Sequence, residues 1–74
     1  MSPAELRAIG RALFGECWGS PLARALGMSP RHMRRLTAGT APISAKIEGE
    51  VCRIARVRRR GIADALNAAS FTDR

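Results

Sequence analysis

Three arginines and the only histidine of the chain lie together in the stretch MSPRHMRRL, residues 28–36. On a helix, Arg31, Arg34 and Arg35 would project from one side, because residues three and four apart are neighbours there. The guanidinium group is planar and always charged, and its fork of N–H donors matches paired acceptors such as a phosphate or the O6 and N7 atoms of guanine. The chemistry that these side chains offer is therefore recognition of an anion or of a guanine edge.

The arginine cluster belongs to a wider excess of positive charge. The chain carries a net charge of +7 at pH 7, with twelve Arg and one Lys. Residues 31–60 hold eight of these Arg and the Lys against two Glu, whereas residues 1–30 and 61–74 have net charges of +1 and −1. A genome that favours Arg codons would explain the choice of Arg over Lys but not this clustering. A domain with its charge concentrated in this way attracts polyanions.

Residues that would support metal binding or catalysis are scarce. Cys17, Cys52 and His32 are the only cysteines and histidine, whereas a zinc site needs about four ligands at close spacing. Two thiols in such a chain fit small buried residues better than a disulfide. There is no paired acid and base, no nucleophile beside a base and no glycine-rich phosphate loop. We expect no enzymatic activity, no metal, no cofactor and no small-molecule ligand.

Length and composition predict one small globular domain over residues 1–74. The chain is 46% apolar, which is typical of a folded domain, and so small a core is often supplemented by a partner surface. No apolar run approaches the ~18 residues of a membrane span, and the N-terminus lacks the charged-then-apolar pattern of a signal peptide. We therefore expect a cytoplasmic protein that forms oligomers.

Capping residues and glycines predict a series of short helices. Ser2 precedes Pro3 and stands three residues before Glu5, which is the pattern of a capping box with Pro at the first helical position. Ser-Pro pairs and single glycines recur further along, as at helix starts and ends. These signals predict helices over 3–14, over 21–26 with Ser20 as the cap, over 30–38 with Ser29 as the cap, and from Ser44 onward.

The C-terminal third of the chain allows two interpretations. Gly61 either ends the fourth helix, so that residues 62–69 form a fifth, or lies within one continuous helix. The segment 61–74 is a candidate dimerisation element or a loose tail, and its apolar residues exceed what a four-helix core needs: Ile62, Leu66 and Phe71. The role of the preceding arginines stays open between a second nucleic-acid surface, the flank of a dimer and a solvated face: Arg53, Arg56, Arg58, Arg59 and Arg60.

The helices over 21–26 and 30–38 carry a recognisable spacing. Ala23 is followed by Gly27 four residues later, by Met33 six residues after that, and by Leu36 three further on. Two helices that pack across a tight corner need such a small residue, a glycine and two apolar anchors. With these residues, the segment WGSPLARALGMSPRHMRRLTAGTAPIS resembles the helix-turn-helix of the phage-repressor family, the Cro and lambda-repressor type often called XRE-like. The sequence thus predicts an all-α, compact four- to five-helix domain with a central helix-turn-helix.

The resemblance implies a sequence-specific regulator that binds double-stranded DNA. In this family the second helix of the motif enters the major groove. The residues that it would use to read bases are Ser29, Arg31, His32, Arg34 and Arg35. Phosphate contacts are expected from helix N-termini and their neighbours, here Ser20, Thr37, Thr40, Ser44 and Lys46. Ser29 can also serve as a helix cap alone.

We expect this regulator to act as a homodimer on an inverted repeat and to repress transcription, including that of its own gene. Small regulators of this kind occur in bacteria, phages, mobile elements, toxin–antitoxin pairs and alongside anti-CRISPR genes, and the sequence does not choose among these settings. Two other classes stay open. One is a basic RNA-binding module, although only 4% of residues are aromatic and RNA modules stack bases on aromatic rings. The other is a protein-interaction module such as an antitoxin or inhibitor.

Overall fold

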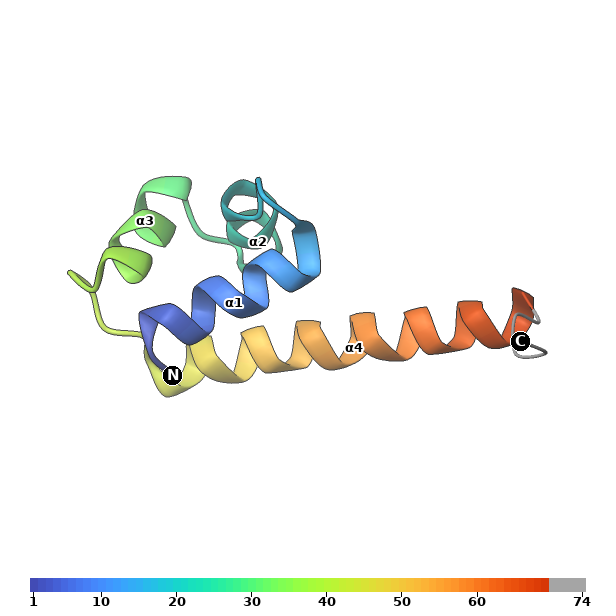
Figure 1. Ribbon diagram of the computed structural model, residues 1–74. Helices are drawn as coiled ribbons and strands as arrows, with labels where there is room; N and C mark the ends of the chain where they lie inside the picture. The colour runs from blue at the N-terminus through green and yellow to red at the C-terminus, as the bar shows by residue number, and fades with distance from the viewer. Residues whose placement is uncertain (70–74) are drawn as a thin grey trace.

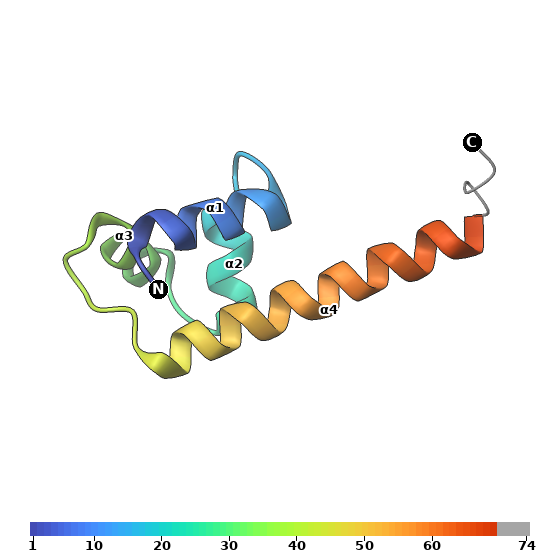
Figure 2. The ribbon, with the colours of Figure 1, turned by 60° about the horizontal axis from the view of Figure 1, so that its bottom comes forward.

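The computed structural model of the chain describes residues 1–69, which form four α-helices and no strand. The helices are α1 (Pro3–Phe14), α2 (Gly19–Leu26), α3 (Pro30–Ala38) and α4 (Ala45–Ala69). Figures 1 and 2 show α1 and α2 beside the first half of α4 and α3 packed on α1 and α2, while the second half of α4 runs clear of them. The all-helical class predicted from the sequence is confirmed.

α1 and α3 have the bounds that their capping residues predict. The Ser2 hydroxyl accepts a hydrogen bond from the Glu5 amide at 3.1 Å, and the Glu5 carboxylate accepts one from the Ser2 amide at 2.8 Å. The hydrogen bond from the Ser2 amide lowers the pKa of Glu5, since it favours the charged carboxylate. At α3, the Ser29 hydroxyl accepts from the His32 amide at 3.1 Å. α1 therefore begins at a reciprocal capping box, and α3 begins at a single side-chain cap.

α2 begins earlier than expected, and the prediction that Ser20 caps it is wrong. The N-cap position belongs to Trp18, which has helical backbone angles and makes no capping hydrogen bond through its side chain. Its carbonyl accepts the Leu22 amide at 3.0 Å, so the first turn is already wound before Pro21. Ser20 instead lies exposed within that first turn.

Packing across α1 explains why Trp18 adopts this conformation. The indole ring of Trp18 lies against Gly10, and a Cβ atom at Gly10 would overlap the ring. Gly10 is itself buried, and Trp18 packs against the core. The absence of a side chain at Gly10 thus creates the place in which the indole ring sits.

α4 is continuous through Gly61, which decides between the two interpretations of the sequence. The Ser44 hydroxyl accepts from the Ile47 amide at 3.2 Å and the Ser44 carbonyl from the Glu48 amide at 2.9 Å, so Ser44 caps α4 as predicted. Its 25 residues correspond to a length of about 37 Å. Within residues 1–69, no helix combines the length and apolar character that crossing a bilayer requires.

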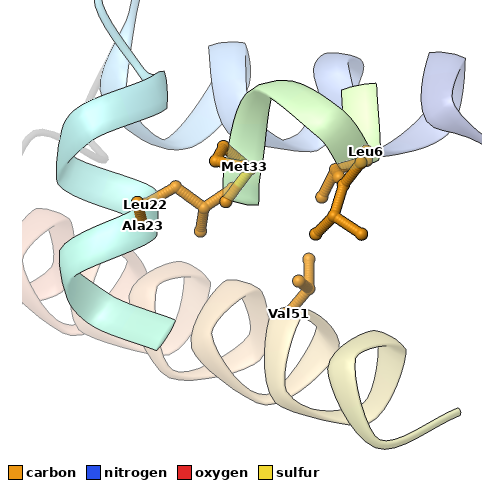
Figure 3. Close-up of a cluster of buried hydrophobic side chains, with 6 residues drawn as sticks. Leu6, Leu22, Ala23, Met33 and Val51 are labelled. Atoms are coloured by element: carbon orange, nitrogen blue, oxygen red, sulfur yellow. The ribbon is translucent and has the colours of Figure 1, made fainter. Parts of the chain in front are cut away.

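The core draws on all four helices. Figure 3 shows the cluster in which Val51 of α4 faces side chains of the other three helices. Its fully buried members are Leu6, Leu22, Ala23, Met33, Leu36 and Val51. Since α2 and α3 each contribute two of these side chains, the core fixes both helices relative to α1 and α4.

Candidate nucleic-acid interface

The connection between α2 and α3 is a tight turn. Gly27 has a φ of 71°, in the left-handed region, and its amide donates to the carbonyls of Ala23 and Arg24. The Met28 amide also donates to the Ala23 carbonyl, at 2.9 Å. Only glycine adopts this backbone conformation without strain. The turn therefore ends α2 and lets Ser29 start α3 at once.

The three arginines of α3 lie on the side opposite its buried residues. Met33 is 2% exposed and Leu36 is fully buried, whereas Arg31, Arg34 and Arg35 are exposed. At about 100° per residue, the arginines share an arc of about 100° that is centred opposite Met33 and Leu36. Within residues 1–69, none of their guanidinium groups forms an ion pair or a hydrogen bond. These side chains, here called the α3 arginines, are positioned but unpartnered.

A groove of about 220 Å³ separates the start of α2 from α3. Its lining residues come from the start of α2, Trp18, Gly19 and Ser20, and from α3, Pro30, Met33, Arg34 and Thr37. In the described part of the chain, the amides of Gly19 and Ser20 donate no hydrogen bond. Free amides at a helix N-terminus, next to a guanidinium group, attract anions. This α2–α3 groove joins two of the predicted phosphate-binding residues to one predicted base-reading residue.

A second groove, of about 320 Å³, lies between the turn and the start of α4. His32 lines it together with Ser44, Lys46 and Glu50. Glu50 is engaged with Arg53 at 3.0 Å, which offsets its negative charge. This α3–α4 groove therefore brings two further predicted phosphate-binding residues, Ser44 and Lys46, next to His32.

Two further predicted phosphate ligands use their hydroxyl protons within α3. Thr37 donates to the Arg34 carbonyl at 3.0 Å, and Thr40 donates to the Arg35 carbonyl at 3.2 Å. A hydroxyl has one proton to donate, so a phosphate contact from either residue requires that bond to break. In this conformation both side chains close the C-terminal end of α3. Ser29 and Ser44 only accept in their caps, so their protons remain free.

No sequence pattern predicted a role for Arg7. Its guanidinium group donates to the Thr37 carbonyl at 2.7 Å, across 30 residues of sequence. This bond satisfies a carbonyl in the last turn of α3 and places a cation where the helix dipole is negative. A periodic pattern assigns Arg7 to the exposed side of α1, but only the packing of α1 on α3 brings these two groups together.

The arginines of α4 divide into separate roles. Arg58 lies over the Phe14 ring at 5.0 Å from its centre and donates to the Leu13 carbonyl at 3.4 Å, so it holds α4 to the end of α1. Arg53 pairs with Glu50. The predicted dimerisation residues Ile62 and Leu66 are 57% and 50% exposed on α4, and Phe71 lies outside the described residues.

Comparisons of the chain with protein-family models, with curated proteins and with solved structures found no match. Among residues 1–69, no three His, Cys, Asp or Glu side chains gather in a way that would hold a metal ion. Function is therefore inferred from the geometry of α2, α3 and the two grooves beside them.

Proposed function

We propose that the chain is a sequence-specific DNA-binding protein with a lambda-repressor-like helix-turn-helix, which inserts α3 into the major groove. The observation that carries this proposal is the set of α3 arginines, exposed and unpartnered within residues 1–69 and directly opposite buried Met33 and Leu36. An α-helix such as α3 is ~10–12 Å across with its side chains, and the major groove, ~12 Å wide, admits one. Each well-placed arginine can discriminate guanine from other bases by ~1–3 kcal/mol.

The grooves on either side of α3 support contacts with the DNA backbone. At one side, the free amides of Gly19 and Ser20 would bind a phosphate through the α2–α3 groove. At the other, Lys46 and the free hydroxyl proton of Ser44 would bind a second phosphate through the α3–α4 groove. Ser29 and His32, at the N-terminal end of α3, would contact the groove wall or a base edge. Backbone contacts of this kind set the register in which α3 meets the bases.

We further propose a transcriptional regulator, a repressor that acts in the bacterial cytoplasm as a homodimer on an inverted repeat. The half-sites would be about 10 base pairs apart, centre to centre, or a multiple of that distance. Blocking a promoter, including its own, requires only occupancy of the operator.

Selection of bound sequences from a pool of random duplexes tests this function. We expect enrichment of an inverted repeat with a guanine in each half-site. Arg34→Ala should relax the base preference at one position, because it removes a base-reading fork. Arg60→Ala removes the same charge from an exposed position on α4, and as the matched control it should retain the preference. A pool that shows no enrichment would contradict the proposal.

RNA binding is the alternative function, and competition between the selected duplex and a single-stranded RNA tests it. Within residues 1–69 the aromatic side chains are Phe14 and Trp18, and both are engaged. Arg58 covers the Phe14 ring, and Trp18 packs against Gly10. In the described part of the chain neither ring is fully exposed, whereas single-strand recognition stacks bases on open aromatic faces. RNA should compete only weakly with the selected duplex.

A further inference from the structure

The projecting half of α4, residues 57–69, exposes an apolar stripe of Val57, Gly61, Ala65 and Ala68, which Ile54 begins. Every residue from 56 to 69 is exposed, and Figures 1 and 2 both show this half clear of the other helices. Val57 is 63% exposed and Ile62 57%. A helix in a protein is stabilised mainly by packing one face against its neighbours. The projecting half of α4 lacks the packing contacts that the first half of α4 makes.

Side-chain size along the stripe selects the kind of partner that fits it. The side chains are large at one end, Ile54 and Val57, and small at the other, Ala65 and Ala68, with Gly61 midway. Ile54, Val57, Gly61 and Ala65 line one open groove of about 390 Å³. A second α4 in the antiparallel direction sets each large side chain opposite a small one. A parallel arrangement sets small side chains opposite small ones and leaves voids, which packing disfavours.

The distribution of charge along α4 also favours antiparallel pairing of two α4 helices. Residues 53–60 contain five arginines and no acidic residue, whereas residues 61–69 contain Asp64 and neither Arg nor Lys. Parallel pairing would bring two arginine-rich segments together. Antiparallel pairing sets each of them against the segment without arginine, which contains Asp64. Complementary charge of this kind fixes the register and orientation of paired helices.

We propose that two copies of the chain pair through residues 54–68 of α4, antiparallel and crossing at Gly61. This deepens the dimer that forms part of the proposed function, and it makes Gly61 the point of closest approach. The two-fold axis passes between the Gly61 residues, so Ile54 meets Ala68 and Val57 meets Ala65. Val51 of each core is ten residues from Gly61, which separates the cores by about 30 Å along α4, close to the ~34 Å between half-sites one helical turn apart.

Sedimentation velocity across the micromolar range tests the pairing. We expect the wild-type chain to form a dimer and Gly61→Leu to weaken self-association by about fivefold or more, because overpacking a crossing loses at least that affinity. A Cβ at Gly61 has no neighbour within 4 Å in one copy, and the same holds for Gly49. Gly49→Leu lies outside residues 54–68 and about 120° around α4 from Gly61, so it is the matched control and should dimerise as the wild type does. A monomeric wild type, or a Gly61→Leu chain that dimerises equally well, would overturn the proposal.

Disulfide trapping tests the direction. In a chain with Cys17→Ser and Cys52→Ala, single variants Val57→Cys and Ala65→Cys are mixed and oxidised. Antiparallel pairing predicts the mixed 57–65 disulfide as the main product, whereas predominance of 57–57 and 65–65 disulfides would show that the helices run parallel. Arg34→Ala should dimerise normally and lose DNA specificity, while Gly61→Leu should still bind a half-site. The two variants therefore distinguish a failure of the proposed α4 pairing from a failure of the proposed DNA recognition.

Discussion

Arg34 differs from the other α3 arginines in its surroundings. It is the one of the three that lines the α2–α3 groove, together with Gly19 and Ser20, whose amides donate no hydrogen bond within residues 1–69. In the proposed complex, Arg34 would lie near both a base edge and a phosphate bound in the α2–α3 groove. The planar fork of this side chain, and not only its charge, therefore matters to the proposed function.

Arg34→Lys separates these two properties. The ammonium group keeps the charge but lacks the rigid planar fork that fits O6 and N7, so affinity for the selected site should fall by about fivefold or more, equivalent to ~1 kcal/mol. The salt dependence of binding should stay close to that of the wild type, because the same charge is present. Equilibrium titrations at several salt concentrations measure both quantities. Equal affinity of the two chains for the selected site would contradict a base-reading role.

Gly10 is important because it has no side chain and so leaves room for the indole ring of Trp18. Gly10→Ala would place a methyl group in the indole ring of Trp18, and overpacking of this kind costs about 1–3 kcal/mol. We expect a lower free energy of unfolding in urea. Gly49→Ala is the matched control, since its Cβ meets no atom within 4 Å, and it should gain up to about 1 kcal/mol from helix propensity. If both variants were stabilised, the close contact with Trp18 would be refuted.

At the scale of the helices, local signals predicted α1, α3 and the start of α4, because Ser2, Ser29 and Ser44 make caps with residues three positions away. The start of α2 escaped prediction because Trp18 takes its conformation from Gly10, a contact across the fold. Continuity through Gly61 was also beyond the sequence, since a glycine lowers helix propensity without forbidding a helix.

The candidate site divides in the same way. The α3 arginines were predictable from helical periodicity, because Met33 and Leu36 define the buried side. The two grooves were not, since each joins residues from different helices: Ser20 with Arg34, and His32 with Lys46. The engagement of the Thr37 hydroxyl and of its carbonyl, the latter by Arg7, likewise depends on distances that only the folded chain defines.

The cap of α1 gives stability a dependence on pH. The folded pKa of Glu5 lies below its ordinary value of 4.5 because of the hydrogen bond from the Ser2 amide. Its contribution is therefore present above about pH 4.5 and is lost as the pH falls through the lower folded pKa. Glu5→Gln keeps an acceptor that does not titrate. Thermal unfolding should show a difference between the two chains that shrinks below pH 4.5, and a difference that grows in acid would contradict this account.

At the scale of the whole molecule, the described chain is elongated, with principal dimensions of 48 × 23 × 20 Å. The α2–α3 unit lies with the helix cluster at one end, and the projecting half of α4 forms the other (Figure 1). This arrangement separates the surface proposed to meet DNA from the surface proposed to meet a second copy. A net charge of +7 adds a long-range attraction that acts on any duplex and carries no sequence information.

Methylation of guanine N7 by dimethyl sulfate tests the central claim most directly, because N7 lies in the major groove and is one of the two atoms that an arginine fork binds. On the selected duplex, the wild-type chain should protect a guanine in each half-site. Arg34→Ala should lose protection at one guanine per half-site, whereas Arg60→Ala should protect all that the wild type does. A bound complex in which every guanine N7 is methylated as in free DNA would contradict the insertion of α3 into the major groove.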